Sequence, residues 1–205
     1  MIKESMYSMP AMWEAFLLEY YERGHYLDEI SRISEQAAHF LATFPDRSEA
    51  DAIILDIDET SLHSPWEFLS PSIPFDGPAF HAFLKRGEGE AIEPVLYLYN
   101  QAIAGGYTVF FITGRDKEKA VATKSNLQKA GYHTWQDVFF RQRRILPEDA
   151  DEPWASAILY KTRIRKKLTE EGYRIICNIG DQHSDLRGGF AEKTYRLPNP
   201  FYTVL

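Results

Sequence analysis

Three carboxylates follow directly on an apolar run in the segment AIILDIDETSL. Residues 52–55 are apolar, and Asp56, Asp58 and Glu59 come immediately after them. Like charges this close repel one another, and burial of a carboxylate adds the cost of lost hydration. Carboxylates clustered without compensating positive charge are typical of a hard-cation site, and Mg²⁺ is the usual occupant. The sequence therefore predicts a Mg²⁺ site that includes Asp56 and Asp58.

Further polar residues follow other apolar runs of the chain. The segment ITGR supplies Thr113 and Gly114, Lys161 follows a short run, and NIGDQHSDL supplies Asp181 and Asp185. A hydroxyl group, a lysine and turn amides are the groups that bind a phosphoryl group, and Asp181 is a third candidate ligand for the cation. Together with a free carboxylate, these groups indicate phosphoryl transfer through an aspartyl-phosphate.

The elements that would position these residues alternate in type from residue 52 onward. Short apolar runs alternate with amphipathic segments that end at glycine, a pattern that predicts a three-layer α/β fold with a Rossmann-like parallel sheet. The carboxyl ends of such strands meet at one edge, where ligands bind. The expected strands are Ala52–Ile57, Tyr107–Ile112, Asp137–Phe140, Ala157–Tyr160, Arg174–Asn178 and Lys193–Arg196, and the expected helices are Pro94–Ala104, Asp116–Ala130 and Lys161–Glu171.

Two segments lie outside this alternation. Residues 1–45 carry apolar and aromatic residues at helical spacing on both sides of Gly24, which predicts a helical pair whose aromatic stripe packs in the core. Residues 61–78, the first part of a segment that extends to residue 92, are so rich in proline that we expect neither a strand nor a helix of the core there. Because this segment directly follows the acidic cluster, it predicts a small cap over the site. We expect one domain, 1–205, with a helical appendage and a cap-like insertion.

Composition and charge limit the classes of function. The chain has 205 residues, of which 44% are hydrophobic, and a formal net charge of −7. That charge argues against the binding of nucleic-acid polymers but allows a small anionic substrate, because a site can be locally positive. No apolar stretch approaches the ~20 residues of a membrane span, and the start lacks the apolar core of a secretory signal. We expect a cytoplasmic protein as the sequence stands, and an exported one with its signal removed as the alternative.

The motifs DIDET, ITGR, Lys161 and GDQHSD resemble, in this order, the four motifs of the haloacid dehalogenase (HAD) superfamily of phosphohydrolases. The segments LYKTRIRKKLTEEGYRIICNIGDQHSDL and LPNPFY are similar to its acid phosphatase branch, which includes bacterial class C acid phosphatases and plant vegetative storage proteins. The resemblance extends from about Ala52 to the C-terminus, and more loosely over the N-terminal helices. It implies a HAD-type fold and Mg²⁺-dependent hydrolysis of small phosphate monoesters.

The resemblance implies roles for the residues of the first two motifs. Asp56 would be the nucleophile and a Mg²⁺ ligand. Asp58 would bind Mg²⁺ through its backbone carbonyl and act as general acid and then as general base. Thr113 and Gly114 would bind phosphoryl oxygens. Superfamily ATPases have threonine at the position of Asp58, so this residue favours phosphatase or mutase chemistry.

The last two motifs carry the remaining implied roles. Lys161 would open a helix, hold the phosphoryl group and screen the charge of Asp56. Asp181 would be the second carboxylate ligand of Mg²⁺. Asp185 would support the waters of the metal or orient Lys161.

Two alternatives to a phosphatase stay open on the sequence. One is a phosphomutase, which needs a cap that excludes water between half-reactions. The other is a binding or storage protein with vestigial activity, although the presence of Asp56 argues against it, since some storage relatives lack the nucleophile. Nucleotides and aromatic phosphates are candidate substrates, because Trp66 and Phe68 lie in the proline-rich segment and are candidates for stacking on a flat group. The competing interpretation is that these rings anchor the loop.

Overall fold

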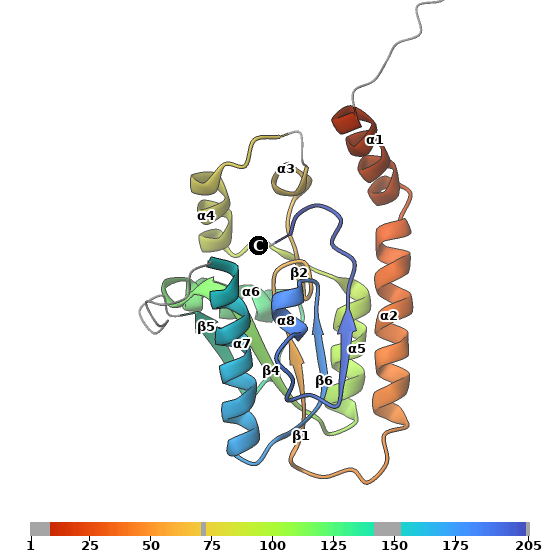
Figure 1. Cartoon of the computed structure of the whole chain (residues 1–205), viewed down its shortest axis with the longest axis vertical. Coiled ribbons are helices and arrows are strands. Elements are labelled where there is room, and N and C mark those ends of the chain that lie inside the picture. Colours follow the sequence, from red (N-terminus) through yellow and green to blue (C-terminus); the bar gives the residue numbers. More distant parts are fainter. Residues whose placement is uncertain (1–8, 71–72, 142–152, 204–205) are drawn as a thin grey trace, which may run out of the picture.

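A five-stranded parallel sheet forms the centre of the computed structural model, which describes residues 9–70, 73–141 and 153–203 (Figure 1). The chain runs from the central strand outward to one edge, then crosses back to form the other half. The expected α/β fold is therefore confirmed, and the reversal point beside β1 is where such sheets bind ligands. In spatial order the strands are β5 (Asp137–Arg141), β4 (Thr108–Asp116), β1 (Asp51–Leu55), β6 (Arg174–Gly180) and β7 (Lys193–Arg196).

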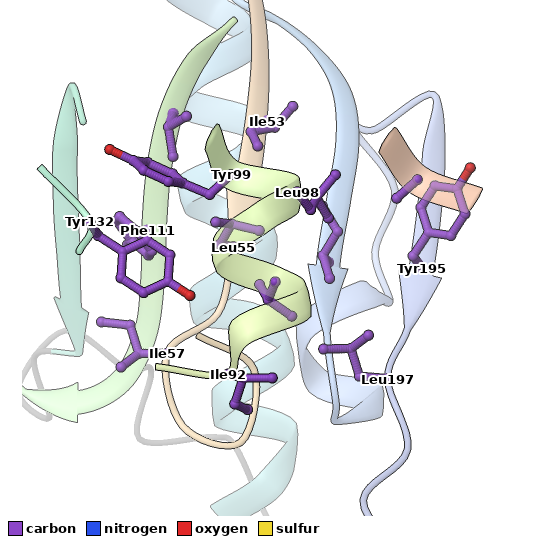
Figure 2. Packing of buried hydrophobic residues seen from close by; sticks show 14 of the residues in the cluster. Ile53, Leu55, Ile57, Ile92, Leu98, Tyr99, Phe111, Tyr132, Tyr195 and Leu197 are labelled. Carbon is purple, nitrogen blue, oxygen red and sulfur yellow. The ribbon is translucent and has the colours of Figure 1, made fainter. Parts of the chain in front are cut away.

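Helices cover both faces of this sheet because β1 alternates its apolar side chains between them. Ile53 and Leu55 pack in one cluster with Leu98 of α5 (Glu93–Ala104) (Figure 2), and α6 (Ala120–Lys129) contributes to the same cluster. Ala52 and Ile54 pack in a second cluster with residues of α7 (Pro153–Glu170). The short helix α8 (His183–Leu186) follows β6. In the described part of the chain, no helix is both long and apolar enough to cross a lipid bilayer.

The N-terminal segment forms the expected pair of helices, α1 (Met9–Glu22) and α2 (His25–Ala42), on either side of Gly24. Gly24 has φ of 82°, a conformation that glycine adopts without strain. Helix α2 packs along α5 over the sheet, whereas α1 projects beyond it (Figure 1). The expectation that the whole aromatic stripe packs in the core is therefore wrong for Trp13 and Phe16, which are 51% and 54% exposed.

The proline-rich segment contains four short elements beyond the carboxyl ends of the strands: β2 (Leu62–His63), α3 (Trp66–Leu69), α4 (Gly77–Arg86) and β3 (Glu90–Ala91) (Figure 1). Its prolines are compatible with these helices because Pro65 and Pro78 stand at helix starts, where no N–H is needed. Strands β2 and β3 pair antiparallel and tie the two ends of the segment together.

Two expected boundaries near the site are wrong. The strand predicted at Ala157–Tyr160 is part of α7, so Lys161 lies inside a helix and does not open one. A run of four apolar residues is too short for its period to distinguish strand from helix. Strand β4 continues through ITGR to Asp116, with an irregular register between Thr113 and Asp116, and a 3₁₀ turn at Lys117–Lys119 precedes α6.

The beginning of β1 is held by ion pairs between a buried carboxylate and two partly exposed arginines. Asp51 is 0% exposed and accepts hydrogen bonds from the backbone N–H of Ser48 and from the guanidinium groups of Arg47 and Arg174. Burial raises the pKa of Asp51, but the hydrogen bonds and charges of these partners outweigh it and hold the pKa below its ordinary value. Because Arg174 is the first residue of β6, this pair aligns the two strands that lead into the site.

We expect Asp51→Asn to lower the free energy of unfolding at pH 7 by about 1–3 kcal/mol, because it removes the charge from several buried hydrogen bonds. Since the pKa is lowered on folding, this stabilisation is present above the unfolded pKa of about 4 and is lost as the pH falls further. Denaturant unfolding should show the variant and the wild type converging toward pH 2. Asp137→Asn, which removes an exposed ion pair of 3.8 Å with Lys124, is the control and should change stability by less than about 0.5 kcal/mol. An equal effect of the two variants would contradict the role of Asp51.

Candidate active site

Asp56 lies immediately after β1, with its backbone N–H donating to the carbonyl of Ile179 on β6. Its side chain is 8% exposed, and Oδ1 accepts a hydrogen bond of 2.5 Å from Nζ of Lys161. The same ammonium group donates to Oδ1 of Asp185, also at 2.5 Å. Lys161 is therefore a buried bridge between the carboxylates that follow β1 and β6.

Helical spacing explains how α7 delivers this lysine. Ala157, Lys161, Arg165 and Leu168 are all buried and fall on one face of the helix, whereas Lys166 and Lys167 pair with glutamates on the exposed face. Lys161 thus lies in the middle of α7 and points toward the carboxyl ends of the strands. Desolvation lowers the pKa of Lys161, but the charges of Asp185 and Asp56 outweigh it and raise the pKa above its ordinary value.

Three buried carboxylates converge at this point. Asp56, Asp181 and Asp185 each offer an oxygen, and the three oxygens lie within 4.8 Å of one another. Their three negative charges face the single positive charge of Lys161, which leaves two in excess. Close carboxylate oxygens with two uncompensated charges are the donor set that a hard divalent cation requires. The site is thus suited to a divalent metal ion.

Asp181 is fixed by hydrogen bonds from its neighbour in the sequence and from two other segments of the chain. Its carboxylate accepts from Thr60 Oγ1 at 3.1 Å, from Gln182 Nε2 at 2.5 Å and from Asn199 Nδ2 at 2.7 Å. Burial raises the pKa of Asp181 to about 7, Asp185 adds to this effect, and the hydrogen bonds from Asn199 and Gln182 oppose it. Asn199 is a site residue that sequence reasoning about the strand ends misses, because it lies beyond the last strand, in the segment LPNPFY.

Asp185 is positioned by hydrogen bonds to its backbone carbonyl and to its side chain. Its carbonyl accepts hydrogen bonds from Arg165 at 2.6 Å and from Asn178 at 2.9 Å, and its Oδ2 accepts from the N–H of Gln182. A side chain on Gly180 would place Cβ 2.4 Å from Cβ of Asp185, so this approach requires glycine. Arg165 was also missed, although its place four residues after Lys161 puts it on the same helix face.

Asp58 turns away from the carboxylate triad. Its carboxylate is 25% exposed, and Oδ1 accepts hydrogen bonds from Nη2 of Arg115 at 2.8 Å and from Nε at 3.1 Å, while Oδ2 accepts from the same Nε at 3.2 Å. The remaining arm of Arg115 donates to Oγ1 of Thr123 at 3.1 Å, so the guanidinium group is held from behind. Bidentate pairing of this kind fixes the plane of a carboxylate as well as its position. Asp58 is therefore held at the edge of the site, separate from the oxygens that face the candidate metal.

Thr113 and Gly114 lie on the other side of Asp56, at the carboxyl end of β4. Thr113 is fully buried, and its hydroxyl oxygen accepts the backbone N–H of Arg115 at 3.1 Å. Gly114 lines the cavity above, and a Cβ there would meet nothing within 4 Å. Six of the seven residues that the motifs predict line one cavity, and Thr113 lies buried next to Gly114 without lining it; the six are Asp56, Asp58, Gly114, Lys161, Asp181 and Asp185.

A cavity of about 690 Å³ opens above these residues. Its outer wall is apolar and comes from the proline-rich segment, with Phe68 of α3 and Phe80 of α4 in ring contact at 5.3 Å. Trp66 does not line this cavity, because its ring packs against Tyr21 and Phe201 instead. Of the two aromatic residues predicted to contact a substrate, the structure places Phe68 at the cavity and Trp66 in the packing of the loop.

Comparisons with known proteins agree with this geometry. Residues 3–205 match the family model described as “HAD superfamily, subfamily IIIB (Acid phosphatase)”. The chain is 32% identical over 189 residues to the stem 28 kDa glycoprotein of Glycine max, covering 90% of this chain and 72% of that protein. It is 30% identical over 203 residues to acid phosphatase 1 of Solanum lycopersicum, covering 97% and 77%. Vegetative storage protein 1 of Arabidopsis thaliana is 26% identical over 203 residues, covering 96% and 72%.

The fold is also similar to a solved structure. The class C acid phosphatase from Bacillus anthracis superposes with a TM-score of 0.72, covering 95% of this chain and 85% of that one. The sequence identity between the two chains is 18%. At that level the comparison supports the arrangement of sheet, helices and inserted segment.

A divalent cation such as Mg²⁺ should stabilise the protein more at pH 7.5 than at pH 5. The pKa of Asp181 is raised on folding, from about 4 to about 7 without metal, so its contribution to stability is lost as the pH rises through that window. A bound cation takes the place of the proton on Asp181, so the folded state no longer loses stability when Asp181 ionises at the higher pH. Thermal unfolding with a chelator and with millimolar Mg²⁺, at both pH values, measures the difference.

Asp181→Asn should lose most of the cation-induced rise in Tm. Asp137→Asn, which changes an exposed carboxylate on the edge strand β5, is the matched control and should keep that rise. A rise of the same size at both pH values, or one unaffected by Asp181→Asn, would rule out cation binding by the triad.

Proposed function

Since the chain belongs to subfamily IIIB of the HAD superfamily, the acid phosphatases, and is a phosphoric monoester hydrolase, we propose that its reaction passes through an aspartyl-phosphate on Asp56 and requires Mg²⁺. The observation that carries this proposal is the buried contact of 2.5 Å between Asp56 and Lys161, beside two further carboxylates. Burial and the neighbouring carboxylates raise the pKa of Asp56, and the ammonium group of Lys161 opposes this shift and favours the ionised, nucleophilic form.

Asp56 attacks the phosphorus of the ester in the first half-reaction. An Asp56 oxygen forms a bond to phosphorus, the ester P–O bond breaks, and the leaving oxygen takes a proton from Asp58. In the second half-reaction, water transfers a proton to Asp58 and attacks the same phosphorus. Phosphate is released, and Asp56 is restored as a carboxylate. Each proton that Asp58 gives is thus returned.

Lys161, Thr113 and Gly114 are proposed to bind the phosphoryl oxygens. Lys161 lies against Asp56 and offers a fixed positive charge where negative charge develops in the transition state. Mg²⁺ would be held by the side chains of Asp56 and Asp181 and by the backbone carbonyl of Asp58, and would supply further positive charge to the phosphoryl group. Asp185 is proposed to support the metal's waters and to orient Lys161, which it contacts at 2.5 Å.

The pair of Asp58 and Arg115 fits the proposed acid–base role. Arg115 fixes the carboxylate in one plane at the edge of the cavity, from where it can reach a leaving oxygen without entering the metal site. Asp58 is therefore held where a group that gives a proton to the leaving oxygen and takes one back from water would have to lie.

The names of two relatives are consistent with the alternative that this chain is a storage protein with vestigial activity. Two relatives reported above are a stem glycoprotein and a vegetative storage protein, and one is an acid phosphatase. A working enzyme is favoured because this chain has the complete set of Asp56, Asp58, Lys161 and Asp181. Each of these side chains is held in place by hydrogen bonds.

The cavity favours a substrate with a flat or apolar leaving group. Its volume of about 690 Å³ exceeds what phosphate alone fills, and its wall carries Phe68, Phe75 and Phe80. We propose small phosphate monoesters, among them nucleotides and aromatic phosphates, as the substrates. Arg141 and Lys119 also line this cavity.

The experiment that tests the function is Asp56→Asn. This change keeps the shape of the side chain and removes the nucleophile, so release of phosphate from a panel of monoesters with Mg²⁺ should vanish while Tm stays measurable. Wild-type protein should release phosphate and should stop when a chelator is added. Substantial turnover by Asp56→Asn would show that the covalent mechanism is wrong.

Phe68→Ala should raise KM for aryl phosphates and nucleoside monophosphates by about tenfold, since base–aromatic stacking contributes about 1–3 kcal/mol. Glycerol phosphate offers nothing to stack, so its KM should stay within about twofold. Phe16→Ala, which removes an exposed ring on α1, is the control and should change neither value. Equal changes for both kinds of substrate would assign Phe68 to packing alone.

A further inference from the structure

A buried carboxylate next to Asp58 takes no part in the proposed chemistry. Glu59 is 0% exposed, and its backbone has φ of 52°, in the left-handed region that a side chain disfavours. Its Oε1 accepts the backbone N–H of Ser64 at 2.9 Å, and its Oε2 lies 2.7 Å from Nδ1 of His63. Burial and backbone strain both cost free energy, so such a residue persists only where its surroundings fix it.

The imidazole of His63 connects this carboxylate to the N-terminal helix. Its Nε2 lies 2.7 Å from the hydroxyl of Tyr21 on α1, and the two rings stack with centroids 5.4 Å apart. One assignment satisfies every group: Nδ1–H donates to the ionised Glu59, and Nε2 accepts from the tyrosine hydroxyl. Tyr21, His63 and Glu59 therefore form a continuous chain of hydrogen bonds, in which the two rings are 42 residues apart in the sequence.

This chain ends on the loop that orients the catalytic groups. Glu59 is bonded to Asp58 through the backbone, and its own N–H donates to the carbonyl of Leu62. The next two residues contact the site directly, since Thr60 donates to Asp181 and Ser61 donates to the carbonyl of Asp56 at 2.6 Å. A shift of Glu59 therefore changes the direction in which Asp58 points before it disturbs the sheet.

We propose that Tyr21, acting through His63 and Glu59, is a positioning residue for Asp58, which makes α1 a working part of the active site. This inference rests on the proposed role of Asp58 as general acid. The helical pair, expected from the sequence to be an appendage, then supplies a hydroxyl group that holds the strained turn after the nucleophile.

A positioning role has a signature that packing alone does not produce. The ratio kcat/KM reports the first phosphoryl transfer, in which Asp58 protonates the leaving oxygen. A misplaced acid slows alkyl phosphates, which need that proton, and spares aryl phosphates, which leave readily without it. General loss of stability would lower both ratios together.

Tyr21→Phe is the test, and Tyr20→Phe is its matched control. Each removes one hydroxyl group from the same helix, and Tyr20 donates to Glu29 at 2.7 Å, within the helical pair. For Tyr21→Phe we expect kcat/KM to fall about tenfold on glycerol phosphate, the size of one hydrogen bond, and less than twofold on an aryl phosphate. Tyr20→Phe should change neither ratio, and Asp58→Asn should show the same leaving-group dependence as Tyr21→Phe, with a larger loss.

A double-mutant cycle extends the test to the whole chain of hydrogen bonds. Glu59→Gln should show the same dependence on the leaving group, and the double variant Tyr21→Phe/Glu59→Gln should be no slower than Glu59→Gln alone, because both act through one path. If Tyr21→Phe fails to fold, His63→Gln replaces it in the cycle.

The inference is overturned if Tyr21→Phe matches Tyr20→Phe, if aryl and alkyl phosphates lose activity equally, or if the two changes multiply in the double variant. Failure of the proposed function looks different. In that case the wild type releases no phosphate, Asp56→Asn remains active, or Asp58→Asn shows no dependence on the leaving group.

Discussion

The gathering of three carboxylates around one buried lysine is the constraint on which the rest of this structure depends. Asp56, Asp181 and Asp185 would repel one another and lose hydration without Lys161, and the lysine would be equally costly without them. Lys161 balances only one of the three charges, so the arrangement stays incomplete until a cation joins it. The surrounding strands, helices and loops must therefore hold these carboxylates close together against their mutual repulsion.

The residues that hold the three carboxylates in place come from distant parts of the chain. The parallel sheet places Asp56 and Asp181 at adjacent strand ends, and the Asp51–Arg174 pair aligns the same two strands from their beginnings. Helix α7 supplies Lys161 and, one turn later, Arg165, which holds the backbone of Asp185. Hydrogen bonds from Thr60, Gln182 and Asn199 then fix Asp181 from three sides. No single element could do this, because each one provides support from only one direction.

The sequence was sufficient for the parts that have a local signature. Apolar runs of strand length predicted the sheet, and because all parallel strands end at one edge, the polar residues that follow them predicted Asp56, Asp58, Gly114, Asp181 and Asp185 at the cavity. Prediction failed where the local pattern allowed two answers. The run at Ala157–Tyr160 is too short to show a period, and it became part of α7 because Ala157, Lys161 and Arg165 must share one face. Trp66 and Phe68 looked equivalent in the sequence, and only packing against Tyr21 and Phe201 separates them.

Residues that support the site from a distance have no such signature, and they explain why both ends of the described chain belong to the site. Phe201 packs edge-on against Tyr26 and Trp66. Asn199, two residues earlier in the chain, donates a hydrogen bond to Asp181. Tyr21 on α1 forms a hydrogen bond with His63. One aromatic cluster thus joins the N-terminal helices, the inserted segment and the C-terminal segment directly behind the loop that carries Asp56 and Asp58. A helix that projects beyond the sheet, with Trp13 and Phe16 exposed at its far end, buries its near end where the acidic loop needs support. The near end of α1 is therefore held beside the acidic loop by a hydrogen bond and ring contacts of Tyr21.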